Sequence, residues 1–263
     1  MLEFRTPAGR IAFQVLVTLL IVPFLYPLVV MVMTSFKGQG FVANYSAVLG
    51  QPLLPRFFVN STIISVAVVA LTYVCTMMAA FAFAKLRIPW KNLMFYVLLA
   101  ALTLPPAVLM VPLFTTVLKL GLFDTYWAVI LPLTALAVPF TVLLARTYVI
   151  GLPDELLDAA KIDGATTFQA FVMIILPLCG PITAVIVVWS MLAAWNEYMI
   201  PLLFMQDPAK QVITQLPSYF LSEYGSDETK IITASVITSL PIIIVYLFLQ
   251  RFIERGLTAG AVK

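Results

Sequence analysis

The side chains best able to do chemistry are concentrated in one short stretch of this sequence. Four carboxylates, from Asp154, Glu155, Asp158 and Asp163, surround a single cation, Lys161. A long apolar run precedes this stretch and another follows it directly. The acidic stretch therefore needs an explanation in a chain that is 62% hydrophobic.

A second polar group falls in the sequence VVWSMLAAWNEYMIP. On a continuous helix Trp189, Ser190, Ala193, Asn196 and Glu197 would share one broad face, because positions i, i+4 and i+7 align. A carboxylate in such an apolar run lines an aqueous path or pairs with a neighbouring helix, and both alternatives stay open. We expect this carboxylate near the outer surface.

Several kinds of chemistry are excluded by what the chain lacks. There is no histidine, so a Ser–His nucleophile pair and the metalloprotease H-E-x-x-H pattern are impossible. No G-x-x-x-x-G-K-[ST] sequence is present, so the chain has no P-loop of its own for a nucleotide. If energy is used, another polypeptide supplies it. We expect no catalytic residue, cofactor or metal in this chain.

The elements that must position these groups are membrane spans. With only 10% charged residues the chain cannot cover a soluble globule of this size. At 1.5 Å of rise per residue each of six apolar runs can cross about 30 Å of hydrocarbon. Their limits are 11–34, 58–84, 92–117, 125–149, 174–204 and 231–251. The fold class expected is an all-α integral membrane protein with six transmembrane helices.

Prolines lie well inside most of these runs. Each removes a backbone donor and tends to kink its helix, which a bundle tolerates when neighbouring groups bind the freed carbonyls. For any single proline a kinked packing interface is the simpler interpretation. Together they indicate a bundle that bends around a pathway.

Orientation follows from Lys and Arg in the short connections. The N-terminus, the second and fourth connections and the C-terminus hold ten of the fifteen: Arg5, Arg10, Lys85, Arg87, Lys91, Arg146, Lys161, Arg251, Arg255 and Lys263. The other side has Lys37, Arg56, Lys119, Lys210 and Lys230. Both termini and the acidic stretch are therefore predicted to face the cytoplasm.

Two other local patterns predict no function. Cys75 and Cys179 lie within or at the edge of spans, where a small buried side chain is expected. Asn44 and Asn60 begin three-residue matches to the glycosylation pattern, but such matches are common by chance.

The acidic stretch itself predicts a helix, a glycine turn and a second helix. Pro153 suits a first helical turn, and a stripe of Leu157, Ala160, Gly164 and Phe168 would form one apolar edge. Gly164 can end the first helix in a left-handed cap, and the sequence T-x-x-Q from Thr166 is a capping box for the next helix. Membrane-surface helices usually carry Lys and Arg, so this acidic helix fits a partner protein's groove better than lipid.

The spacing of this stretch resembles a known signature. Asp158-Ala159-Ala160, then Gly164, Ile174, Leu176 and Pro177 are similar to the EAA signature of permease subunits of binding-protein-dependent ABC importers, with Asp in place of the leading Glu. Residues 40–263 further resemble the carbohydrate branch, the maltose-type, MalG-like subunits. The segments carrying this likeness are NYSAVL, NSTIIS, LPPAVLMVPLF, LPDELLDAAKIDGA and RGLTAGAVK.

The resemblance implies a type I ABC importer transmembrane domain with a cytoplasmic coupling helix. It assigns ATPase coupling to Asp158, Ala159, Ala160, Asp163 and Gly164. It implies residues 1–57 as an N-terminal segment with the first span and an outer loop, and residues 58–263 as the permease core. Within that core lie an EAA loop at 151–177 and a cytoplasmic tail at 252–263.

Partners and location also follow from the resemblance. It implies two ATP-binding subunits that carry ATP and Mg²⁺, a second permease subunit of the MalF-like kind and an extracytoplasmic solute-binding protein. The chain would lie in the lipid bilayer of the bacterial cytoplasmic membrane, without nucleic acid. The substrate class would be a sugar, polyol or related solute.

Two surfaces are assigned to the solute and its delivery. Trp189, Asn196 and Glu197 are expected on the translocation path, since sugars favour an aromatic face beside hydrogen-bonding groups. In the outer segment 205–230, Tyr219, Phe220 and Tyr224 are expected to contact the binding protein, with a lipid-interface aromatic belt as the alternative.

The rival class is an ATP-independent channel or an ion-coupled secondary carrier. Such proteins typically show an intramembrane charge network or inverted repeats, and neither is evident in this sequence. A membrane-embedded enzyme is the third alternative, and the absence of histidine and of paired intramembrane acids counts against it.

Overall fold

The computed structural model describes the backbone of residues 7–221 and 227–259, and all its regular elements in these ranges are helical. Contacts divide the chain into two compact units. Unit 1 comprises Met1–Pro52 and Leu216–Leu240, and unit 2 comprises Leu53–Gln215 and Pro241–Lys263.

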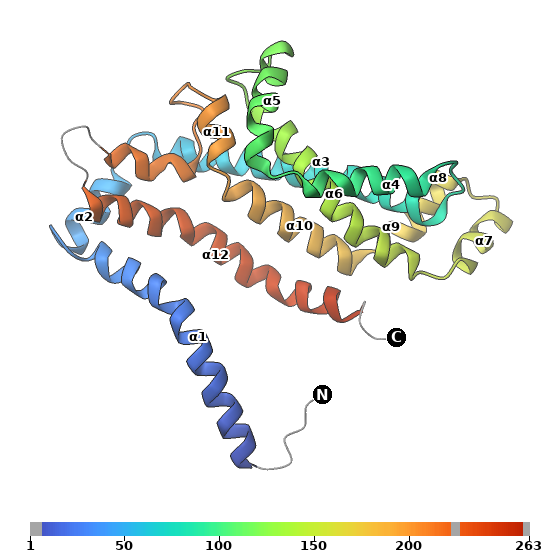
Figure 1. Cartoon of the computed structure of the whole chain (residues 1–263), viewed down its shortest axis with the longest axis horizontal. Helices are drawn as coiled ribbons and strands as arrows, with labels where there is room; N and C mark the ends of the chain where they lie inside the picture. The colour runs from blue at the N-terminus through green and yellow to red at the C-terminus, as the bar shows by residue number, and fades with distance from the viewer. Residues whose placement is uncertain (1–6, 222–226, 260–263) are drawn as a thin grey trace. The chain divides into compact units, whose positions relative to one another are not determined.

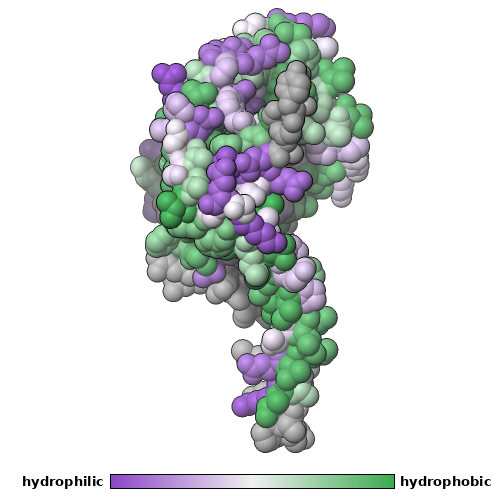
Figure 2. Space-filling view, turned by 90° about the vertical axis from the view of Figure 1, so that its left-hand side faces the viewer, coloured by the Kyte–Doolittle hydropathy of each residue, from purple (hydrophilic) through white to green (hydrophobic). Residues whose placement is uncertain are grey.

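Unit 1 begins with a long apolar helix. α1 spans Pro7–Ser35 and contains Pro23 and Pro27 without ending at either. None of the apolar window of this helix is buried within the chain. Figure 2 shows it as a mostly hydrophobic rod in the lower part of the view. Such a surface is stable only against lipid or another helix.

A tight turn links α1 to α2, which spans Phe41–Leu49. Gly38 adopts a positive φ of 65°, a conformation that side-chain-bearing residues rarely take. The amide of Asn44 is 1% exposed, and its Nδ2 donates to the carbonyl oxygens of Ser35 (2.9 Å) and Lys37 (2.8 Å). Asn44 is therefore a buried amide that fixes the turn.

Unit 2 is built around three long helices. α3 spans Leu54–Lys85, α6 spans Trp127–Ile150 and α10 spans Gly180–Trp195. α3 packs against both of the others (Figure 1). A 2.6 Å hydrogen bond between the buried hydroxyls of Thr76 and Thr141 ties α3 to α6, a polar link of the kind that helps helices associate in lipid.

The remaining elements are short apart from α12, which has 32 residues. They are α4 (Lys91–Ala100), η1 (Ala101–Thr103), α5 (Pro106–Lys119), α7 (Glu155–Ile162), α8 (Thr167–Ala170), the π-helix η2 (Phe171–Ile175), α9 (Leu176–Leu178), α11 (Met199–Phe204), the 3-10 helix η3 (Ile213–Phe220) and α12 (Glu228–Ala259). α12 passes from unit 1 to unit 2 at Pro241.

Four helices in the described residues are long and apolar enough to span a membrane singly: α1, α3, α6 and α12. Their bounds confirm the expected runs 11–34, 58–84, 125–149 and 231–251 within a few residues. Two further candidates are bent helix pairs, Lys91–Thr103 with Pro106–Lys119 at 105° and Thr167–Leu178 with Gly180–Trp195 at 80°.

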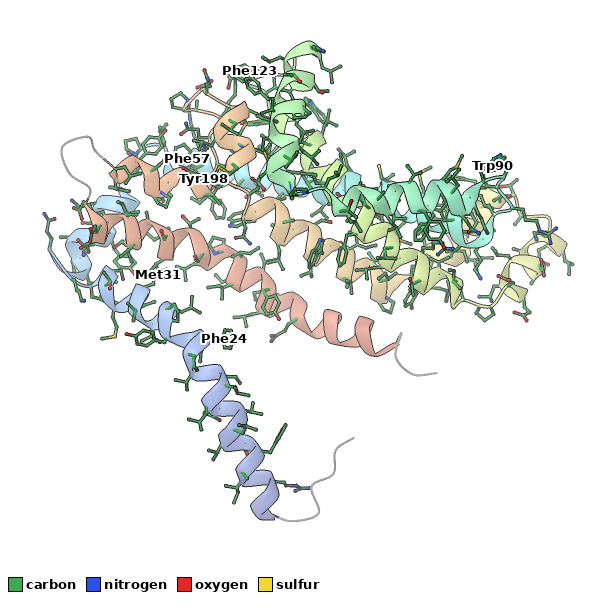
Figure 3. The ribbon with its side chains drawn as sticks, in the orientation of Figure 1. Phe24, Met31, Phe57, Trp90, Phe123 and Tyr198 are labelled. Carbon is green, nitrogen blue, oxygen red and sulfur yellow. The ribbon has the colours of Figure 1, made fainter. Side chains whose placement is uncertain are left out.

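The first bent pair runs from one end of α3 to the other. At the start of α4, Lys91 Nζ donates to the carbonyl oxygen of Leu86, just beyond the last residue of α3. After α5, Tyr126 OH donates to Asn60 Oδ1 (2.8 Å), in the second turn of α3. In Figure 3, Trp90 before α4 and Phe123 after α5 are correspondingly far apart. These contacts at opposite ends of α3 favour one broken crossing over a re-entrant loop.

The second bent pair also runs from the C-terminal end of α3 to its N-terminal end. Near its start the Phe171 ring lies 5.0 Å from that of Phe81, close to the C-terminal end of α3. At its end the Trp195 ring lies 5.6 Å from that of Phe58, in the first turns of α3. Counting both pairs with the four long helices gives the six crossings expected.

The runs 92–117 and 174–204, in which the sequence predicts proline kinks, are bent pairs of helices and not single kinked helices. The first run breaks between Thr103 and Pro106, at the Pro105-Pro106 pair. The second breaks at Cys179, between Pro177 and Pro181, and again after Trp195. Proline removes the donor that would continue each helix, so the freed carbonyls permit a sharp bend.

A polar network holds the loop 205–212 against the N-terminal end of α3. Asn60, 4% exposed, donates from Nδ2 to the carbonyl oxygens of Ala209 (2.9 Å) and Gln211 (2.8 Å). Asp124 accepts from the backbone N–H groups of Gln206 and Asp207, and it pairs with Lys210 (3.0 Å). The backbone hydrogen bond from residue 207, with help from the lysine, holds the pKa of the Asp124 carboxyl below its usual range.

Candidate functional site

The acidic helix α7 is attached to the bundle by a buried lysine. The side chain of Lys85, the last residue of α3, is 4% exposed. Its Nζ donates to the carbonyl oxygen of Leu152 (2.6 Å) and to Oδ1 of Asp154, the residue that precedes α7. The hydrogen bond and positive charge of Lys85 hold the pKa of the exposed Asp154 carboxyl below its usual range.

α7 itself has two faces. Ala160 is 4% exposed and, with the half-buried Leu157, packs toward the bundle. The opposite face exposes Asp158, Ala159 and Asp163. The side chain of Ile162 is 87% exposed next to these carboxylates. The exposed face of this short helix is therefore partly apolar and partly acidic. Exposed apolar side chains rimmed by charge are typical of protein contacts.

The single cation of the helix adds little rigidity. Lys161 Nζ lies 2.9 Å from Asp158 Oδ1, and both side chains are about 70% exposed. Exposed i, i+3 pairs are worth at most a few tenths of a kcal/mol, roughly. The pair therefore leaves Asp158 available to a stronger partner.

Gly164 ends α7 in the left-handed turn expected from the sequence. Its φ is +78°. The N–H of Gly164 donates to the carbonyl oxygen of Lys161 (3.1 Å), and the N–H of Ala165 donates to that of Ala160 (2.9 Å). These two bonds form a Schellman motif, which satisfies carbonyls that the helix end would otherwise leave free.

The capping box that follows is also confirmed. Thr166 Oγ1 accepts from the backbone N–H of Gln169 (3.3 Å), and Gln169 Oε1 accepts from the backbone N–H of Thr166 (2.8 Å). The chain then continues through α8, the π-helix η2 and α9 into the bend before α10. Phe171, Ile175 and Cys179 anchor this segment in a core cluster with α3 and α6.

The expected apolar edge of Leu157, Ala160, Gly164 and Phe168 is wrong as one surface. The first two residues face the bundle, whereas Gly164 and Phe168 are exposed, the latter to 68%. The glycine turn changes the chain direction after Ile162, so helical periodicity cannot continue across it.

The polar face predicted near Glu197 is only partly helical. Trp189 lies in α10, 48% exposed, with its ring 4.5 Å from that of Phe140 on α6. Asn196 caps the end of α10 and is exposed. Glu197 lies beyond the helix, so its expected place on one face of α10 is wrong. Its Oε1 accepts from the N–H groups of Met199 (2.9 Å) and Ile200 (3.1 Å) and thus caps α11.

Of the three aromatic residues expected to contact a binding protein, Tyr219 and Phe220 lie at the end of η3, both half-buried. Burial raises the pKa of the Tyr219 hydroxyl. Tyr224 lies outside the described residues.

Sequence reasoning singled out Asp154 among the four carboxylates but did not pair it with Lys85, and it did not single out Ile162. Lys85 and Asp154 are 69 positions apart, so no local pattern could pair them. Ile162 lies outside the apolar stripe predicted from the sequence, and its side chain is 87% exposed. Among the described residues no group of three or more His, Cys, Asp or Glu side chains is placed to hold a metal ion.

The fold and this loop define a polytopic helical membrane component with an exposed acidic helix. Residues 73–259 match the family described as "Binding-protein-dependent transport system inner membrane component", and the chain belongs to that family. This match includes the acidic helix, both bent helix pairs and all of α12.

Curated relatives and solved structures agree with this membership. The chain is 31% identical to the probable ABC transporter permease protein YurM of Bacillus subtilis, with 97% of this chain and 89% of the relative covered. It is 38% identical to the arabinooligosaccharides transport system permease protein AraQ of Halalkalibacterium halodurans, over 79% and 74% of the two chains. It shares its fold with a chain from the crystal structure of "a bacterial ABC transporter involved in the import of the acidic polysaccharide alginate" (TM-score 0.79, 22% identity, 95% and 99% covered).

Proposed function

We propose that this chain is the permease subunit of an ATP-driven importer that carries a sugar or related solute across the bacterial cytoplasmic membrane. The observation that carries the proposal is the exposed face of α7, with Asp158, Ala159, Ile162 and Asp163 held on a rigid turn. Family membership supports the transport role, and the names of relatives that import oligosaccharides support the solute class.

In this proposal α7 docks into a groove of an ATP-binding subunit. Small Ala159 permits close approach, Ile162 enters an apolar part of the groove, and the flanking acids pair with cations there. ATP and Mg²⁺ lie on two such subunits, and this chain contributes no catalytic group. A second permease subunit completes the pathway, and an extracytoplasmic solute-binding protein delivers the solute.

Movement of α7 has two routes into the bundle. The contact of Lys85 with Asp154 joins the start of α7 to α3. The packing of Phe171 on Phe81 joins the segment after α7 to the same helix. ATP binding that closes the ATPase pair would therefore move α3 and α10 together, as in a rigid-body switch between inward- and outward-facing states.

The solute path is assigned to the exposed face of Trp189, backed by Phe140, together with Asn196. Glu197 belongs to the same region through its cap of α11. Tyr219, Phe220 and Tyr224 are assigned to the contact with the binding protein. Positive charge in the connections places both termini and α7 in the cytoplasm.

The test is affinity purification of the tagged chain from cells that express its whole transport system. Wild type is compared with Ala159→Glu on the exposed face of α7 and with Ala47→Glu, the same change on an exposed alanine of α2. We expect an ATPase to co-elute with wild type and Ala47→Glu, and about tenfold less of it with Ala159→Glu, since a charge is forced into the interface.

Reconstitution of the purified wild-type complex completes this test. Solute uptake should require ATP and a binding protein, with arabinooligosaccharides as the first probe. Equal co-elution with all three proteins would reject α7 as the dock. Uptake by wild type without ATP would instead favour an ATP-independent channel or secondary carrier.

A further inference from the structure

A cavity of about 430 Å³ lies beside α7, between the C-terminal end of α3 and the turn that leads to α8. Its walls are apolar groups from these elements. Its charged lining consists of the cations Lys85, Arg87 and Lys161, with Thr167 beside them, and includes no carboxylate. A recess lined by cations and apolar groups suits an amphiphilic anion.

The cations near the C-terminal end of α3 differ in the interactions they make inside the protein. Lys91 donates to a backbone carbonyl, Arg146 lies 4.1 Å over the ring of Phe95, and Lys85 and Lys161 each pair with an aspartate. The cations compared are the Lys and Arg residues from 85 to 161 that lie at this end of unit 2. Within the described part of the chain, Arg87 is the one among them that makes no hydrogen bond or ion pair. Its guanidinium is exposed at the cavity.

The depth of the cavity in the membrane follows from its neighbours. At 1.5 Å per residue the 32 residues of α3 extend roughly 48 Å, more than the roughly 30 Å of hydrocarbon, and the charged Lys85 at its end is favoured at the level of the headgroups. Trp90, in the same loop as Arg87, is 76% exposed and lies at this end of unit 2 (Figure 3). Exposed tryptophans concentrate at the level of lipid headgroups.

We propose that this cavity is a phosphate-group site filled by the headgroup of an anionic lipid, with Arg87 as its principal ligand. Arg87 can donate two parallel hydrogen bonds to phosphate oxygens, and Lys85 and Lys161 add positive charge to the lining of the same cavity. The apolar walls accept the glycerol and first methylenes. A bound headgroup would contact both the α3–α4 loop and the turn after α7. It would therefore restrict the movement of α7 relative to α3.

The inference depends on the membrane location of the chain and not on ATPase coupling. Its test therefore uses binding to the full-length chain, purified in neutral detergent with its co-purifying subunits and without ATP. The readouts are the thermal unfolding midpoint during titration with short-chain phosphatidylglycerol, and lipid retained in native mass spectrometry. Phosphatidylcholine and inorganic phosphate are titrated in parallel.

The matched variants are Arg87→Gln and Arg56→Gln. Arg56 is also exposed but lies at the other end of α3. We expect phosphatidylglycerol to raise the midpoint of wild type and Arg56→Gln, and its apparent affinity to fall roughly tenfold in Arg87→Gln, with partial recovery in Arg87→Lys. Phosphatidylcholine should have little effect.

The other possible results either identify a different anion or reject the lipid site. If inorganic phosphate stabilises wild type as well as the lipid does, the phosphate site stands and its source is a free anion. If Arg87→Gln titrates like wild type, the site is rejected. If Arg87→Gln leaves lipid binding unchanged but loses the ATPase, Arg87 contacts an acidic partner protein and the lipid proposal is overturned.

Discussion

Gly164 is the residue on which the position of α7 most directly depends. Its φ of +78° is required by the turn, yet a Cβ added there would meet no atom within 4 Å. The cost of a substitution is therefore conformational and not steric. For a β-branched residue it should be about 1–2 kcal/mol, whereas Asn tolerates the left-handed region better.

We predict that Gly164→Val lowers the thermal unfolding midpoint of the complex and reduces co-elution of the ATPase, while Gly164→Asn preserves both. The two side chains are similar in size, but the β-branched Val disfavours the left-handed region that Asn tolerates. If Val and Asn behaved alike, the turn would not control the docking helix.

One of the contacts that join the acidic helix to the bundle is the ion pair of Lys85 with Asp154, so this element should respond to pH. The pKa of Asp154 lies below its ordinary value of 3.8 because of Lys85. A carboxyl with a lowered folded-state pKa stabilises the fold above its unfolded-state pKa and loses that contribution as pH falls through the folded value. α7 should therefore loosen below pH 3.8 and not at neutral pH.

Hydrogen exchange of the α7 amides, corrected for intrinsic rate, measures this effect. We expect protection to fall as pH drops from about 5 to 3 in wild type. In Asp154→Asn the protection of the α7 amides should be low at every pH in this range and should change little with pH. Glu155→Gln, next along the chain and exposed, serves as control and should follow wild type. A wild-type profile that does not change over this range would contradict the proposed attachment.

How far the elements follow from sequence depends on the range of the interactions. The glycine turn at Gly164 and the capping box from Thr166 were predicted because both use residues a few positions apart. The breaks at Pro105 and near Cys179 were not predicted. Local sequence does not distinguish these prolines from Pro132 and Pro139, which occur in equally apolar sequence and remain inside α6. Whether a proline kinks or breaks a helix depends on which neighbours bind the freed carbonyls, and those neighbours are distant in sequence.

At the scale of the whole molecule, the two bent pairs decide the topology. If each pair crosses the membrane once, the chain crosses six times and its termini lie on the same side. A re-entrant α4–α5 pair would instead place the two ends of the pair on one side. The contacts of Lys91 at one end of α3 and of Tyr126 at the other support a full crossing.

We therefore predict opposite accessibility for Asn92→Cys and Lys119→Cys, at the outer ends of α4 and α5. Both positions are exposed, and Cys75 is replaced by Ala in each variant to remove the exposed native thiol. In intact cells a membrane-impermeant maleimide should label Lys119→Cys alone, whereas Asn92→Cys should react only in inverted vesicles. Asp163→Cys, on the α7 side, should label like Asn92→Cys, because contacts at the C-terminal end of α3 place both on one side. Labelling of Asn92→Cys and Lys119→Cys from the same side would instead make the α4–α5 pair re-entrant and would change the direction in which α6 crosses the membrane.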